Sequence, residues 1–323
     1  MKKVLLAILS LLCLNLMAQS ENNLKEVEKF QQARVKEQIQ WTHKYKGGTP
    51  NPEGRKNTIS KFNKKGYLIE KTTFSRSGEV STIFKFEYDK KGRKILNETE
   101  DKGSKSYFKQ EFFYKNDLKV KEITENRTSA GRSVYAQEYS YNKKNQLSEI
   151  IKTNFLTRRI EFKWKYAYKK NKTIIEELKN GNQLTKKTNR NYNDKNLLTE
   201  QIVEDLKNNV TIKTLYNYDS KGNNIVTTEY RNDNQTKLQE LKYDSYNNLI
   251  EIINKEPDGS SYTNNKYKYN TRQELEEELW HERNDDYSKK SLKYDEKGLL
   301  IEVNYYYALY KYQLLYKFTY DYY

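Results

Sequence analysis

Residues 218–223 of this chain read Tyr-Asp-Ser-Lys-Gly-Asn, and variants of this pattern recur along most of the sequence. Its leading aromatic residue returns every 24 to 27 positions. A register kept from residue 62 to residue 320 is typical of a repeat protein, in which each copy folds into the same small unit. The anchor residues are Phe62, Tyr88, Tyr114, Tyr141, Tyr168, Tyr192, Tyr218, Tyr243, Tyr269 and Tyr294, with a truncated copy at Tyr320.

Each anchor, numbered here as position 0, opens a turn. Position +1 is Asp or Asn in eight of the ten full repeats, and position +4 is Gly or Asn in seven. Asp and Asn accept local backbone hydrogen bonds at the first corner of a type I turn. Gly and Asn tolerate the left-handed conformation that closes it. The pattern therefore predicts a three-residue hairpin loop with a bulge, and a positive φ at positions such as Gly222.

Two strands flank each turn. Position −2 is aromatic or leucine in eight repeats, and position +6 is aliphatic in eight. We expect position 0 to pair with +6 and position −2 with +8, so that these residues share one apolar face and charged residues occupy the other. The sequence predicts an all-β fold, an antiparallel meander of about twenty strands in ~26-residue, two-stranded repeats.

An open sheet of that size would be about 90 Å wide and would expose a long aromatic stripe. We therefore expect it to coil into a curved sheet or a hollow shell. The aromatic residues at position −2 would then point inward, and they are Phe86, Phe112, Tyr139, Tyr166, Tyr216 and Tyr267.

Residues 1–18 read as a secretory signal peptide, with two lysines before an apolar run from Val4 to Leu14. That run is too short to span a membrane as a helix, so no transmembrane span is expected in the mature chain. The single cysteine, Cys13, lies inside it, which leaves the mature chain without thiols. We expect an exported protein of the periplasm, the cell surface or the extracellular space.

The remaining chain divides into two parts. We assign residues 19–54 to an N-terminal cap, made of a short helix and a strand, that shields the open end of the stack. Residues 55–323 form the β-repeat array. The formal charge is +16, spread over lysine-rich turns, and thirty tyrosines at fixed register argue against disorder. Export makes nucleic acid an unsuitable partner, whereas glycans or acidic envelope polymers suit the basic charge.

Three repeats match the signature Tyr-Asp-x-x-Gly closely, at Tyr88, Tyr218 and Tyr294, and the copy at Tyr243 matches in part. In these motifs the chain resembles the YD-repeat (RHS-like) family of exported bacterial proteins, over most of residues 55–323. The resemblance implies repeats that spiral into a hollow β-shell and, for some members, carbohydrate binding. The repeats here are longer than is typical of that family. The chain also reaches Tyr323 without a self-cleaving core segment, so we expect no toxin-delivery role.

The sequence shows no catalytic or cofactor motif. Its two histidines, His43 and His281, lie about 240 residues apart, which excludes a catalytic triad or a histidine-rich metal site. We expect no metal and no cofactor.

Position +8 is glutamate in eight repeats. On the expected register these carboxylates face position −2, about 10 Å from one copy to the next. That spacing exceeds the reach of one metal ion and the carboxyl separation of glycosidases. We expect a structural ladder with tyrosine hydroxyls or lysines. The functional alternative is a polar stripe that binds sugar or peptide, for which the candidate residues are Glu149, Glu176, Glu200, Tyr139, Tyr166 and Tyr216.

These observations favour an exported, non-catalytic repeat scaffold or binding protein of the bacterial envelope or surface, with carbohydrate as the candidate ligand. The alternative is a glycan-acting hydrolase that uses interior carboxylates. An outer-membrane barrel is disfavoured, because glutamates on one face and dense charge on the other leave no face suited to lipid.

Overall fold

The computed structural model describes residues 24–282 and 286–323, which form a helix at residues 24–33 followed by a sheet of 23 strands. A 3-10 helix, η1 (Ala308–Tyr310), interrupts the last connection. The strands are β1 (Val35–Lys46), β2 (Thr49–Pro50), β3 (Arg55–Phe62), β4 (Leu68–Phe74), β5 (Val80–Tyr88), β6 (Lys94–Asp101), β7 (Ser106–Lys115), β8 (Leu118–Thr128), β9 (Gly131–Tyr141), β10 (Leu147–Asn154), β11 (Ile160–Lys169), β12 (Lys172–Lys179), β13 (Gln183–Tyr192), β14 (Leu198–Asp205), β15 (Val210–Tyr218), β16 (Asn224–Arg231), β17 (Asn234–Tyr243), β18 (Leu249–Lys255), β19 (Ser261–Tyr269), β20 (Leu275–His281), β21 (Tyr287–Tyr294), β22 (Leu300–Tyr307) and β23 (Tyr312–Tyr322). The predicted signal peptide, residues 1–18, lies outside the described residues.

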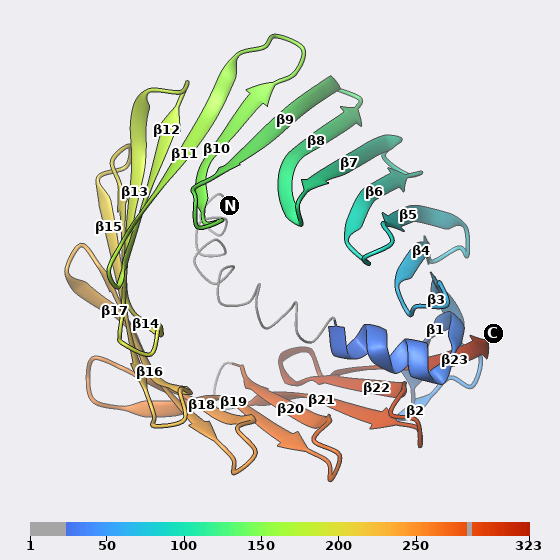
Figure 1. The fold of residues 1–323 in the computed structure, drawn as a ribbon. Coiled ribbons are helices and arrows are strands. Elements are labelled where there is room, and N and C mark those ends of the chain that lie inside the picture. Colours follow the sequence, from blue (N-terminus) through green and yellow to red (C-terminus); the bar gives the residue numbers. More distant parts are fainter. Residues whose placement is uncertain (1–23, 283–285) are drawn as a thin grey trace.

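The sheet closes into a barrel. From β3 to β23 each strand pairs antiparallel with the next, and β1 pairs with both β3 and β23. Figure 1 shows the resulting ring, in which β1 joins the first repeat to the last. The all-β antiparallel meander is confirmed, but the curved open sheet is wrong. Closure satisfies the backbone groups of β3 and β23, which would otherwise remain exposed as sheet edges.

The anchor turns have the predicted geometry. In the turn after Asp89, the Gly92 amide donates to the Asp89 carbonyl, and the Asp89 amide donates to the Arg93 carbonyl. The Asp89 carboxylate accepts from the amides of Lys91 and Arg93, as position +1 requires. The residues at +4 have φ values from +58° to +92°, which confirms the left-handed turn, and they are Gly66, Gly92, Asn145, Asn196, Gly222, Asn247 and Gly298.

The anchor tyrosines connect neighbouring repeats. The Tyr218 hydroxyl, for example, donates to the Leu198 carbonyl in the preceding repeat, at 2.6 Å. This bond explains why the anchor is tyrosine rather than phenylalanine in most copies, because phenylalanine has no hydroxyl to donate. The same bond, at 2.6–3.0 Å, is made by Tyr88, Tyr114, Tyr141, Tyr168, Tyr243, Tyr269, Tyr294 and Tyr320.

The strand register differs from the expected one beyond position 0. In most repeats position 0 pairs with +6 as expected, but +8 pairs with −1 rather than −2, whereas Tyr114 and Tyr168 pair with position +5. Lys61 thus lies opposite Glu70, and Lys242 lies opposite Glu251. An extra residue at +7 forms a bulge, and one extra residue moves every later side chain to the other face. The expected common face for the +8 glutamates and the −2 aromatic residues is therefore wrong in these repeats.

The two faces of the wall can be assigned from the helix. It lies inside the ring of strands in Figure 1, and Phe30 packs on the anchor Phe62 with ring centroids 4.5 Å apart. The face that carries the anchors and position −2 is therefore the lumen face, and the glutamates opposite position −1 lie on the outer face. Phe30, Val35, Phe62 and Leu299 form a buried cluster where the helix meets the wall.

Candidate functional site

The six residues predicted as a ligand site lie on opposite sides of the barrel wall. Tyr139, Tyr166 and Tyr216 are at position −2, on the lumen face, whereas Glu149, Glu176 and Glu200 are on the outer face. On the outer face, Glu149 forms an ion pair with Lys163 at 3.2 Å. Glu176 lies opposite Lys165, and Glu200 accepts a hydrogen bond from Asn191 at 2.6 Å. Glu149, Tyr166 and Glu176 nevertheless line one concave pocket of about 700 Å³, which the other three candidates do not line. A ligand-binding role for these residues stays a prediction.

One glutamate of the ladder does face the lumen. The loop before β8 is shorter, so Glu122 lies opposite Phe112 and is 6% exposed. It accepts hydrogen bonds from Gln110 (2.6 Å), Lys119 (2.9 Å) and Tyr139 (3.1 Å). Burial acts to raise the pKa of Glu122, but the bonds from Lys119 and Gln110 outweigh it and hold the pKa below its usual value. This satisfied carboxylate matches the expected structural ladder and has little capacity left for a ligand.

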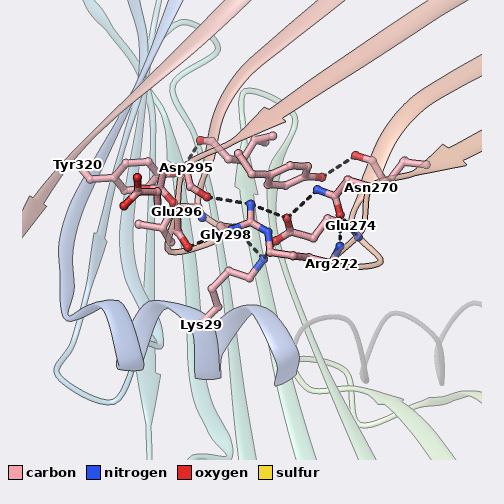
Figure 2. A network of polar contacts seen from close by, with 12 residues as sticks. Lys29, Asn270, Arg272, Glu274, Asp295, Glu296, Gly298 and Tyr320 are labelled. Atoms are coloured by element: carbon pink, nitrogen blue, oxygen red, sulfur yellow. Dashed lines mark hydrogen bonds and ion pairs between the residues drawn. The ribbon is translucent and has the colours of Figure 1, made fainter.

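The helix is held at the end of the barrel formed by the anchor turns. Lys29 donates to Glu274 at 2.9 Å and to the Gly298 carbonyl at 2.7 Å, as Figure 2 shows. At the other side, Gly66 lies against the helix so closely that an added Cβ would be 2.1 Å from the Val27 carbonyl oxygen. The helix is thus anchored to turns from both ends of the chain.

The Glu274 carboxylate organises this contact. It also accepts from Asn270 at 3.0 Å and forms an ion pair with Arg272 at 3.0 Å. Burial acts to raise the pKa of Glu274, but the hydrogen bonds from Asn270 and Lys29 outweigh it, and the pKa lies below its usual value. The carboxylate is therefore charged when Lys29 docks.

A concave pocket lies between the helix and the lumen wall formed by β1, β3, β4, β5 and β6. We call it the helix pocket, and its volume is about 570 Å³. That value lies within the range of about 300–1,000 Å³ found for small-molecule sites. Aromatic residues of the wall contribute much of its surface, and they are Phe62, Tyr67, Phe86 and Tyr88.

A row of polar side chains crosses the same pocket. Gln38, Ser60 and Lys71 lie opposite one another on the adjacent strands β1, β3 and β4, so they span about 10 Å. Lys94, opposite Tyr88 on the next hairpin, adds a second ammonium group. Among the described residues, the side-chain polar atoms of Ser60, Lys71 and Lys94 have no hydrogen-bond or ion-pair partner.

Burial in the helix pocket shifts the pKa values of two of its side chains. Desolvation lowers the pKa of Lys94, and its ammonium group lies 4.7 Å from the centroid of the Phe86 ring. Desolvation, followed by the neighbouring Tyr67, raises the pKa of Tyr88 to about 12. Two ammonium groups that have no carboxylate partner in the described part of the chain, beside aromatic rings, can bind an anionic ligand that also has an apolar surface.

Sequence reasoning identified only part of this pocket. The period-2 pattern placed Phe86 on the inward face, and Ser60 at position −2 and Lys94 at position +6 are polar exceptions at inward positions of the same pattern. Lys71 carried no such signal. The convergence of these side chains depends on the bulge at +7 and on the docked helix. Within the described residues, no helix is long and apolar enough to cross a bilayer. The same residues also contain no group of three or more His, Cys, Asp or Glu side chains that could hold a metal ion.

The similarity of this chain to known proteins is slight. No protein-family model matches the chain, and no curated protein matches it. The TcdB2-TccC3-Cdc42 crystal structure is similar at 11% identity and a TM-score of 0.37, over 83% of this chain and 18% of that chain. A porin-like protein from Bacteroides uniformis is similar at 10% identity and a TM-score of 0.33, over 72% of this chain and 94% of that chain. A porin-like protein from Bacteroides vulgatus is similar at 8% identity and a TM-score of 0.20, over 88% of this chain and 98% of that chain. These similarities are too slight to assign a family or a function, so the YD-repeat resemblance stays a prediction.

Proposed function

We propose that this protein is an exported, non-catalytic β-barrel of the bacterial envelope or surface that binds carbohydrate in its lumen. The observation that carries the proposal is the helix pocket, where aromatic rings lie beside hydroxyl and ammonium groups that have no hydrogen-bond or ion-pair partner within residues 24–282 and 286–323. A sugar ring has apolar C–H faces that pack on aromatic side chains, and a rim of hydroxyls that need hydrogen-bond partners.

The outer wall supports a location in water rather than in lipid. Lysines and glutamates pair along it, such as Lys61 with Glu70 at 2.9 Å and Lys293 with Glu302 at 2.7 Å. Membrane barrels carry an apolar band on their lipid-facing side, and charges there are costly. We therefore place both faces of the barrel in water, in the periplasm, at the cell surface or outside the cell.

The alternative, a glycan-acting hydrolase, needs two carboxyl groups about 5–9.5 Å apart across the scissile bond. Among the described residues that line the helix pocket, Glu26 is the sole carboxylate. A binding role needs no such pair, and the proposal therefore favours binding over hydrolysis.

A glycan array probed with the mature protein tests the proposal. We expect retention of a defined set of glycans, and loss of that retention in Phe86→Leu, which removes an aromatic ring from the pocket. Phe113→Leu is the matched control, because Phe113 lies at position −1 on the outer face and is 43% exposed. Absence of retained glycans, or equal loss in both variants, would contradict the proposal. Release of reducing sugar from a retained glycan would instead favour the hydrolase.

A further inference from the structure

We propose that the helix pocket selects acidic sugars, with the carboxylate of a uronic acid bound between Lys71 and Lys94. This inference rests on the proposed function and names the class of carbohydrate. It comes from the charge and placement of the groups that line the pocket.

The helix pocket has an excess of positive charge. Several lysines on the outer wall pair with glutamates across the strand, as Lys242 does with Glu251 at 2.8 Å. In the helix pocket, Lys71 and Lys94 have no such partner among the described residues, and Glu26 from the helix is the sole carboxylate. A pocket with this excess of positive charge favours an anion over a neutral ligand.

The two lysines of the helix pocket lie on either side of its aromatic floor. Lys71 lies opposite Phe84 on β5, and Lys94 lies opposite Tyr88 on the same strand. The two lysines therefore flank the strand that carries Phe86, from its two sides. The Lys94 ammonium group also lies over the Phe86 ring, 4.7 Å from its centroid, so a sugar ring bound along this strand lies beside both strands that carry an ammonium group for its exocyclic carboxylate.

Neutral polar groups also line the helix pocket. Ser60 is 6% exposed and lies between Gln38 and Lys71 in the row across β1, β3 and β4. Gln38 donates to the Tyr320 hydroxyl at 2.8 Å, which fixes its amide and leaves the amide oxygen available. A hydroxyl and an amide in line with an ammonium group suit a ligand that carries hydroxyls along one edge and a carboxylate at its end. A free fatty acid or an inorganic anion would leave these groups unused.

The binding experiment compares oligomers of galacturonate, glucuronate and guluronate with their carboxyl-reduced, neutral counterparts, by titration calorimetry. We expect the acidic oligomers to bind at least tenfold more tightly, which is about the value of one charge-assisted hydrogen bond. Their affinity should fall as salt rises from 50 to 500 mM, because the contact is electrostatic. Equal affinity for the acidic and reduced oligomers would overturn the inference.

Variants locate the contact. Lys71→Met and Lys94→Met keep the aliphatic stem and should each weaken uronate binding by about tenfold, with little effect on the reduced sugars. Lys85→Met is the matched control, since Lys85 lies on the outer face of β5 and removes the same net charge. Equal loss in Lys85→Met, or no loss in either pocket variant, would overturn the inference. Thermal melting of each variant separates loss of folding from loss of contact.

The two proposals fail in different ways. Neutral glycans retained in a Phe86-dependent manner, without preference for uronates, would leave the proposed function standing and remove the acidic selectivity. Failure of all glycans to bind would remove both.

Discussion

Replacement of Lys29 by methionine should loosen the helix without disturbing the barrel. The substitution removes a 2.9 Å ion pair with Glu274, a 2.7 Å hydrogen bond to the Gly298 carbonyl, and a cation–π contact with Tyr294 at 5.6 Å. Glu274 keeps its other partners, Asn270 and Arg272, so its charge is not left unpaired. A hydrogen bond to a charged group contributes about 1.5–3 kcal/mol when buried. Because the Lys29 side chain is 35% exposed, we expect a loss of about 1–2 kcal/mol.

The assay is amide hydrogen exchange of residues 24–33, which reports local opening of the helix. A loss of 1–2 kcal/mol should accelerate exchange there by about 5–30-fold. Amides of β1 should exchange as before, because their hydrogen bonds to β3 and β23 remain. Lys25→Met is the control on the same helix, since Lys25 is exposed and has no side-chain partner among the described residues. Equal exchange rates in both variants would refute the assigned role of Lys29.

Three further predictions concern the repeats. Tyr218→Phe should cost about 1 kcal/mol in urea unfolding, because the Leu198 carbonyl loses its hydroxyl donor. Tyr192→Phe, an anchor without such a bond among the described residues, should cost less, and equal costs would contradict the inter-repeat bond. Gly222→Val should cost on the order of 1 kcal/mol or more, since φ is +92°, and an unchanged melting temperature would count against the bulged turn. Finally, burial raises the pKa of Tyr88 and Tyr218 to about 12, above the usual tyrosine value of 10.0, so the folded state holds these protons longer. The resulting stability is present below pH 10 and lost as pH rises toward 12, so a free energy of unfolding in urea that stays constant between about pH 9 and about pH 12 would contradict it.

The turns and the two-stranded repeats could be predicted from sequence because their causes are local. The Asp89 carboxylate bonds to amides two and four residues away, and Gly92 takes a positive φ within the same turn. Such contacts depend on a handful of neighbouring side chains, so a recurring motif predicts them wherever it occurs. The inward direction of Phe86 follows equally from the period of two along a strand.

Three features were decided by the tertiary structure. The bulge at +7 has no residue signature of its own, yet it moves glutamates such as Glu70 to the outer face, away from the lumen tyrosines. Closure depends on β1, which lacks the anchor motif and pairs with β23 about 280 residues away, as Gln38 does with Tyr320. The helix pocket needs both closure of the sheet and docking of the helix. Its floor is the closed wall, and its cover is a helix held by Lys29 and Phe30. Contacts between such distant segments depend on how the whole sheet curves, which no local pattern of residues encodes.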